Sequence, residues 1–138
     1  SVIVQDGIQC LKVKDDAKTA ASRSRVVPIA KTLLDRVDLF SVAAPVSSAY
    51  EGQEVGKRFG RLKSALGFGR QHVFHSIRKT AATVFEQAGI SEGITADIVG
   101  HEKQTMTYGL YSGGTSIVQR KQAIDQFEVL MLKLEQDG

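Results

Sequence analysis

The sequence predicts an α+β fold that is mostly helical and has a small antiparallel β-sheet near the N-terminus. The first reason is that apolar and polar residues alternate in the first third of the chain, which is typical of half-buried strands. The second is that the apolar period changes after Ala30 to three and four residues, which is typical of amphipathic helices. The 138 residues fit one domain with one core, so we expect a single unit over 1–138.

Three short strands are expected in the first third of the chain. Residues 8–14 alternate in polarity, and the Asp-Gly turn signal before them could join them to a strand at 2–4. Residues 15–24 are small and polar, which indicates a loop or a hairpin tip. The segment 25–29 reads R-V-V-P-I and predicts a returning strand, which Pro28 ends at an edge of the sheet.

The rest of the chain predicts one short helix and four longer ones. Their expected positions are residues 30–37, 50–66, 77–88, 91–99 and 115–135. Gly89 and Gly100 each follow a predicted helix and can end it, Gly89 in the left-handed conformation. The last helix carries an apolar stripe from Ile117 to Leu134. This stripe packs either within its own chain or, beyond a hinge at 112–114, on a neighbouring protomer.

Composition excludes several classes of protein. Apolar residues make up 42% of the chain, which is ordinary for a soluble globular domain and unlike a disordered one. The single cysteine, Cys10, cannot form an internal disulfide, which favours a reducing compartment. No apolar run approaches the length of a membrane span, and no secretory leader is visible. We therefore expect a cytoplasmic protein without a membrane partner.

The charge of the chain permits a nucleic-acid partner but does not demand one, because the net charge is only +3. Its distribution says more, since lysines and arginines gather in two segments, 12–25 and 57–70. Each segment fits a surface for DNA about as well as it fits an ordinary solvated face.

The stretch from residue 75 to residue 111 holds side chains suited to chemistry on a phosphodiester: His75, Arg78, His101 and Tyr111. At about 100° per residue, Arg78 and His75 fall on one flank of their helix, just outside its buried stripe and close to its N-terminus. A phosphate there would meet a guanidinium group, a histidine donor and the positive end of the helix together.

These residues also have simpler interpretations. The two histidines could be unrelated surface residues, although their joint spacing with Arg78 argues against it. They could also be metal ligands, but no cysteine or carboxylate stands at a spacing that would complete a ligand set, so no metal is expected. Tyr108 is an alternative to Tyr111 as a nucleophile.

A set of motifs, in chain order, resembles one known family. The motifs are K-T-A-A-S-R-S-R-V-V-P-I, H-S-I-R-K-T-A-A-T, A-G-I, I-V-G-H and M-T-Y-G-L-Y-S-G-G. Together they resemble the catalytic domain of the tyrosine recombinases, the phage-integrase family, over nearly the whole chain. The spacing is the specific part, because His101 follows His75 by 26 residues and a tyrosine follows about ten residues later.

The resemblance implies a role for each motif residue. Tyr111 matches the nucleophile that attacks a DNA phosphodiester and forms a 3′-phosphotyrosine intermediate. Arg78 matches the second of two arginines that clamp the scissile phosphate. His75 and His101 match the two positions that donate hydrogen bonds to the phosphate and assist proton transfer.

The same resemblance implies a general acid, and it also shows which parts of the family's catalytic machinery this sequence does not contain. Lys18 matches the hairpin lysine that protonates the leaving 5′-oxygen, and Lys14 is the alternative because hairpin length varies. The family's first arginine lies upstream of this hairpin in a G-x-R-x-x-E type of motif, and no such motif precedes Lys18. The family's N-terminal DNA-binding domain is also missing. We therefore expect 1–138 to be a partial catalytic domain that cleaves DNA weakly or not at all by itself.

The function that the resemblance implies is site-specific DNA strand cleavage and rejoining, for integration or excision of a phage or another mobile element. The implied partners are double-stranded DNA and further copies of the parent protein, in a tetrameric synapse at the nucleoid of a bacterial or phage-infected cell. No cofactor is expected, because the reaction exchanges one phosphate ester for another. The alternatives are a degenerate module that binds DNA without cutting it, and a domain that assembles protomers through its last helix.

Overall fold

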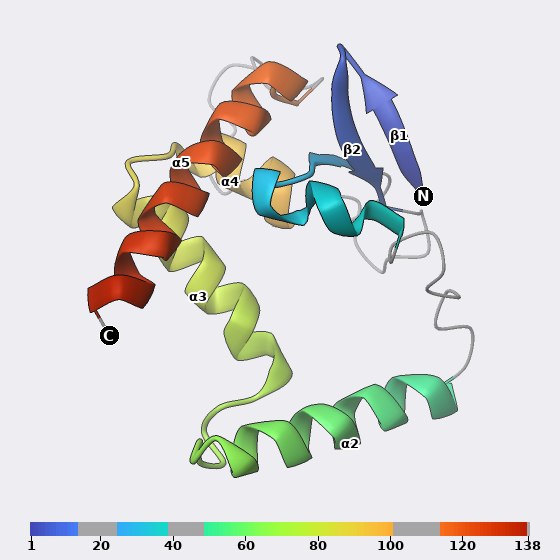
Figure 1. Cartoon of the computed structure of the whole chain (residues 1–138), viewed down its shortest axis with the longest axis vertical. Coiled ribbons are helices and arrows are strands. Elements are labelled where there is room, and N and C mark those ends of the chain that lie inside the picture. The colour runs from blue at the N-terminus through green and yellow to red at the C-terminus, as the bar shows by residue number, and fades with distance from the viewer. Residues whose placement is uncertain (14–24, 39–48, 101–113, 138) are drawn as a thin grey trace.

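The computed structural model describes residues 1–13, 25–38, 49–100 and 114–137 (Figure 1). Its elements in chain order are β1 (Val2–Gln5), β2 (Ile8–Lys12), β3 (Val26–Pro28), the 3-10 helix η2 (Lys31–Arg36), α2 (Ala49–Ala65), α3 (Phe74–Gln87), α4 (Glu92–Val99) and α5 (Ile117–Asp137). The predicted fold class is confirmed, because the protein is mostly helical and its small antiparallel sheet lies near the N-terminus.

The sheet has the strand order β1-β2-β3, and both pairs are antiparallel. Asp6 and Gly7 have φ angles of 51° and 73°, as the tight two-residue hairpin between β1 and β2 requires. Cys10 in the central strand lies opposite Ile3 on one side and Pro28 on the other. Because Pro28 cannot donate a ladder hydrogen bond, it fits the end of an edge strand, as predicted.

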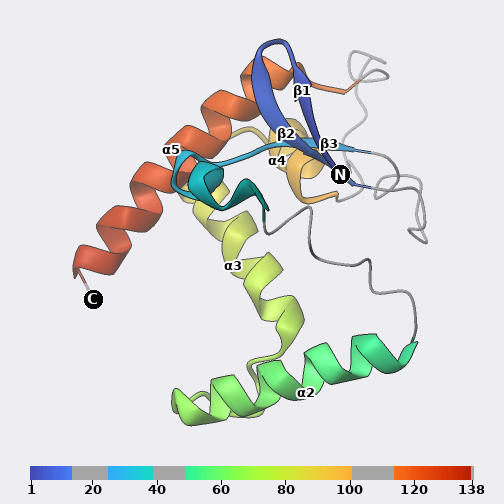
Figure 2. The same ribbon diagram turned by 45° about the vertical axis from the view of Figure 1, so that its right-hand side comes forward.

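The core lies where α3, α4 and α5 meet beneath β3. Its buried members are Phe85 of α3, Ile98 of α4, and Ala123 and Ile124 of α5. The ring of Phe127 stacks on that of Phe85, with the ring centres 4.5 Å apart. Figures 1 and 2 show these three helices gathered beside the sheet. The first half of α5 therefore packs within its own chain.

The ends of the central helices follow the sequence signals. The Ser91 side chain accepts a hydrogen bond from the Ile94 amide at the start of α4. Gly89 after α3 and Gly100 after α4 have φ angles of 75° and 76°, which side chains other than glycine rarely adopt. The short helix predicted at 30–37 is a 3-10 helix, and the Thr32 amide ties it to Glu128 of α5 over 2.8 Å.

Helix α2 stands apart from this core, at the end of α3 that is far from the sheet (Figures 1 and 2). Phe59 of α2 meets Phe74 of α3 edge to face, with ring centres 5.2 Å apart. The apolar stripe of α2 otherwise lines an open hollow of about 350 Å³, shared with α3 and with Met131 of α5. Leu62 and Leu66 are 59% and 65% exposed. The apolar residues of α2 are therefore spaced as in a buried helix face, but no packed core covers them.

Candidate functional site

Arg78 lies one turn into α3, where that helix passes the C-terminal end of α4. Its Nη2 atom donates a hydrogen bond to the carbonyl oxygen of Gly100 over 2.9 Å, and its side chain is half-buried. Gly100 can accept this bond because its left-handed conformation ends α4 and turns the backbone at this point. The acceptor is also the carbonyl that directly precedes His101 in the sequence. The contact therefore joins the H-x-x-R motif to the G-H motif.

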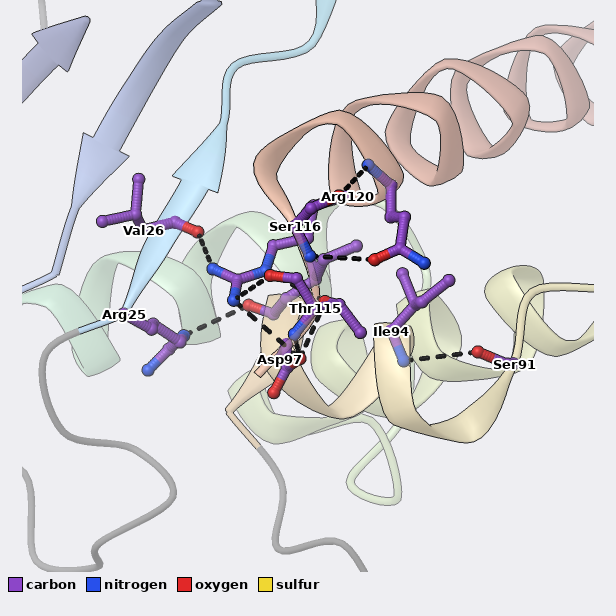
Figure 3. A network of polar contacts seen from close by, with 10 residues as sticks. Arg25, Val26, Ser91, Ile94, Asp97, Thr115, Ser116 and Arg120 are labelled. Carbon is purple, nitrogen blue, oxygen red and sulfur yellow. Dashed lines mark hydrogen bonds and ion pairs between the residues drawn. The ribbon is translucent and has the colours of Figure 1, made fainter. Parts of the chain in front are cut away.

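Arg25 reaches the same end of α4 from the residue before β3 (Figure 3). Its Nε atom donates to the carbonyl oxygen of Ile98 over 3.1 Å. A Cβ atom on Gly100 would lie only 2.7 Å from Nη1 of Arg25, so the guanidinium rests against the bare backbone of the glycine. Burial, and secondly the positive charge of Arg78, lower the pKa of Arg25 from its usual value.

The end of α4 therefore carries two guanidinium groups. The C-terminus of a helix has a partial charge equivalent to about half a negative charge. That partial charge favours the two cations that lie against it. A planar guanidinium group also binds phosphate oxygens in pairs, which the point charge of a lysine cannot do.

A second polar cluster holds the start of α5 against α4. Asp97 accepts two hydrogen bonds on Oδ2, from the amide and the hydroxyl of Thr115, each over 2.7 Å (Figure 3). Arg120 donates from Nε to the hydroxyl of Thr115 over 3.1 Å and from Nη1 to the carbonyl of Val26 over 2.8 Å. Asp97 and Arg120 form an ion pair at 3.9 Å, with both side chains largely buried. This cluster ties α4, α5 and β3 together.

This cluster lies next to the candidate site, because Asp97 belongs to α4, the helix that ends at Gly100. The described chain leaves α4 at Gly100 and resumes at Gly114, immediately before Thr115. Gly100, just before 101–113, is bonded to Arg78, and Thr115, the second residue after that segment, is bonded to Asp97 of α4. Sequence reasoning did not single out Asp97, Thr115 or Arg120. The available signal was an aspartate between apolar residues in the second half of this helix, which reads E-G-I-T-A-D-I-V.

Of the predicted site residues, the structure places two. His75 is the second residue of α3 and is exposed, and Arg78 is half-buried one turn later. Five further predictions lie outside the described residues: His101, Tyr111 with its alternative Tyr108, and Lys18 with its alternative Lys14. The structure adds Arg25, which sequence reasoning counted only as one member of a basic segment.

Two lysines of the second basic segment have partners near them in the chain. Lys57 forms an ion pair with Glu54 at 2.8 Å. Lys63 donates from Nζ to the carbonyl oxygens of Gly69 over 3.1 Å and His72 over 2.5 Å. Lys63 therefore closes the turn between α2 and α3, so part of this segment has a structural role.

The described residues lack a metal cluster and a membrane-spanning helix. Across residues 1–13, 25–38, 49–100 and 114–137, no group of three or more His, Cys, Asp or Glu side chains could hold a metal ion. No helix in those ranges is both long enough and apolar enough to cross a membrane. Comparison with family models, with curated proteins and with solved structures found no match to this chain.

Proposed function

We propose that this chain is the catalytic part of a site-specific DNA recombinase that works through a phosphotyrosine intermediate. One observation carries the proposal: Arg78 of the H-x-x-R motif is bonded directly to Gly100 of the G-H motif, over 2.9 Å. Two motifs separated by more than twenty residues thus share one positively charged corner. Integration or excision of mobile DNA is the biological output that fits the motifs.

The reaction follows from the residues assigned to it. A phenol has a pKa of about 10, so a tyrosine needs help to attack at neutral pH. One of the two histidines, His75 or His101, accepts the phenolic proton of Tyr111 while the oxygen of Tyr111 forms a bond to phosphorus. The bond from phosphorus to the 5′-oxygen breaks, and Lys18 gives a proton to that oxygen. Arg78, His75 and His101 stabilise the charge that gathers on the non-bridging oxygens. Because one phosphate ester replaces another, bond energy is kept for rejoining.

The partners in this proposal are double-stranded DNA and further copies of the parent protein assembled on it, in the cytoplasm. Phosphate contacts position such a protein on the duplex, whereas target sequence is read by contacts to base edges and by DNA shape. The two guanidinium groups at the end of α4 belong to the first kind of contact.

A suicide DNA substrate, which traps the covalent intermediate, tests the proposal on the longest natural protein that contains these 138 residues. We expect a protein–DNA adduct that withstands denaturation, disappears in Tyr111→Phe and persists in Tyr108→Phe. Arg78→Lys should lower the rate of adduct formation by about 100-fold or more, because a preorganised donor to the transition state is lost. Arg36→Lys, an exposed change on η2 outside both basic segments, is the matched control and should leave the rate unchanged.

An adduct that survives Tyr111→Phe would overturn the assigned nucleophile. DNA binding without any adduct would instead identify a module that grips phosphates and does not cut. That second candidate is favoured by the same observation, since two guanidinium groups at one helix end attract a phosphate whether or not a nucleophile attacks it.

A further inference from the structure

The hollow between α2, α3 and α5 has the size and the walls of a small-molecule site. Its volume is about 350 Å³, within the range of about 300–1,000 Å³ that is typical of ligand pockets. Such pockets are lined mainly by apolar and aromatic side chains. Three rings and three aliphatic side chains are among those that line this one: Phe59, Phe68, Phe127, Leu62, Ile77 and Met131. An apolar molecule would displace water from these walls.

His72 adds a polar atom to this apolar lining. Its Nδ1 atom is buried and has no hydrogen-bond partner among the described residues. Buried polar atoms are normally bonded, because an unpartnered one costs free energy. The ring nitrogen of His72 can therefore bond a ligand without giving up a contact within the described chain.

Lys63 lies beside His72 and brings a positive charge to the hollow. Its Nζ atom donates to the carbonyl oxygens of Gly69 over 3.1 Å and of His72 over 2.5 Å. An ammonium group has three N–H donors, so these two bonds within the described chain leave one for a ligand. Lys63 and His72 thus form a polar end of the hollow, where a negatively charged group would accept charge-assisted hydrogen bonds.

The volume limits the length of the occupant. A water molecule takes about 30 Å³ of the liquid, and a methylene group is of similar size, so about 350 Å³ holds roughly ten to twelve non-hydrogen atoms. A straight-chain carboxylate of about ten carbons has that number of atoms. Its single charged group matches the single polar end of the hollow, and its chain matches the apolar walls.

We propose that this hollow binds a medium-chain fatty acid. The carboxylate accepts hydrogen bonds from Nζ of Lys63 and from Nδ1–H of His72, and the hydrocarbon chain lies between α2, α3 and α5. A chain in this place covers the exposed side chain of Leu62. It also links α2, which stands apart from the core, to α3 and α5 (Figure 2). The site does not depend on the proposed function, because neither Lys63 nor His72 takes part in strand cleavage.

The test titrates the 138-residue chain, with ¹³C-labelled methyl groups, with sodium decanoate at pH 7 and below the concentration at which decanoate forms micelles. The methyl signals of Ile77 and Met131 should shift to saturation and show NOEs to the decanoate chain. The signals of Val118, which is exposed and does not line the hollow, should stay in place. Octanoate should bind about tenfold more weakly, because it buries two methylene groups fewer.

Decanol tests the polar end, because it has the same chain length without the charge. It should bind about tenfold more weakly than decanoate, as expected when charge-assisted hydrogen bonds are lost. Lys63→Met should lower the decanoate affinity to about that of decanol and leave the decanol affinity within about twofold. A residue that only stabilises the fold would change both affinities alike. Lys79→Met is the matched control, because Lys79 is exposed on α3 and does not line the hollow, and it should change neither affinity.

Three results would overturn the proposal. The first is the absence of a saturable shift at Ile77 and Met131. The second is equal affinity of the unmodified chain for decanoate and decanol, which decides the role of the polar end even if Lys63→Met does not fold. The third is a shift of the same two signals that follows protein concentration without decanoate, because a second copy of the chain would then cover the hollow.

Discussion

The Nη2 atom of Arg78 lies 2.9 Å from the carbonyl oxygen of Gly100, and this hydrogen bond fixes the start of α3 to the end of α4. Arg78 supplies the donor and Gly100 supplies the acceptor of this contact between the two helices. A longer-range bond of the same kind, from Arg25 to Ile98, completes the corner from the β3 side. The stability of the protein should therefore fall when Gly100 is changed.

Gly100→Ala should destabilise the protein more than Gly89→Ala does. Both glycines follow a helix with φ near 75°, so both substitutions incur backbone strain of about 1 kcal/mol or more. Only at Gly100 would the new Cβ atom meet the Arg25 guanidinium, whereas nothing lies within 4 Å at Gly89. The guanidinium is the far end of a flexible side chain and can shift, so we expect an additional loss of at most about 1 kcal/mol at Gly100, from the weakened bond between Arg25 and Ile98. Urea unfolding of both variants measures it, and equal losses would contradict a tight contact with Arg25.

Asp97→Asn should cost about 2–3 kcal/mol of unfolding free energy, because Oδ2 accepts two hydrogen bonds from Thr115 in a largely buried site beside Arg120. The matched control is Asp125→Asn. Its partner Lys121 lies on the same helix and the Asp125 side chain is half exposed, so we expect a change within about 0.5 kcal/mol. Thermal or urea unfolding measures both, and similar values would show that the Asp97 cluster contributes little.

Glu128 should stabilise the protein above pH 4 and lose this effect in acid. Hydrogen bonding by Thr32 lowers the pKa of Glu128 in the folded state. The stabilisation is present above the unfolded value of about 4.3 and disappears as the pH falls through the folded value. Because the bond is exposed, we expect only about 0.5 kcal/mol. Urea titrations of Glu128→Gln across pH 3–7 test it, with the exposed Glu135→Gln as control, and a pH-independent difference would contradict it.

Cys10 should resist thiol reagents in the folded protein. Its side chain is completely buried in the central strand, and burial raises the pKa of its thiol. The folded state thus favours the protonated thiol, so this contribution is present below the unfolded pKa of about 8.5 and is lost as the pH rises through the folded value. We expect labelling at pH 8 to be at least about 100-fold slower than in urea, at a rate that follows opening of the fold. Rapid labelling of the native protein would contradict the burial of β2.

The elements could be predicted because their signals are local. The hydrophobic period and the glycines Gly89 and Gly100 set the helix limits within a few residues, and the Asp-Gly turn set the first hairpin. The apolar stripe of α2 could also be predicted from the sequence. The spacing of apolar residues does not tell, however, which other element packs against them. In the structure much of this stripe faces an open hollow.

The candidate site could be predicted only in part, because it depends on contacts between distant residues. The motifs placed His75 and Arg78 near the start of one helix, where the structure has them. Nothing in a single sequence sets Arg25 against Ile98, which is 73 positions away. The placement of His101, Tyr111 and Lys18 lies outside the described residues and stays a prediction.

The polar contacts that close this fold also set the order in which it can form. Arg120 reaches back 94 positions to Val26, and Glu128 reaches back 96 positions to Thr32. During synthesis, the three strands are therefore made well before α5 exists to contact them. The apolar surface that α5 covers stays exposed on the nascent chain until that helix has been made, and exposed apolar surface favours aggregation.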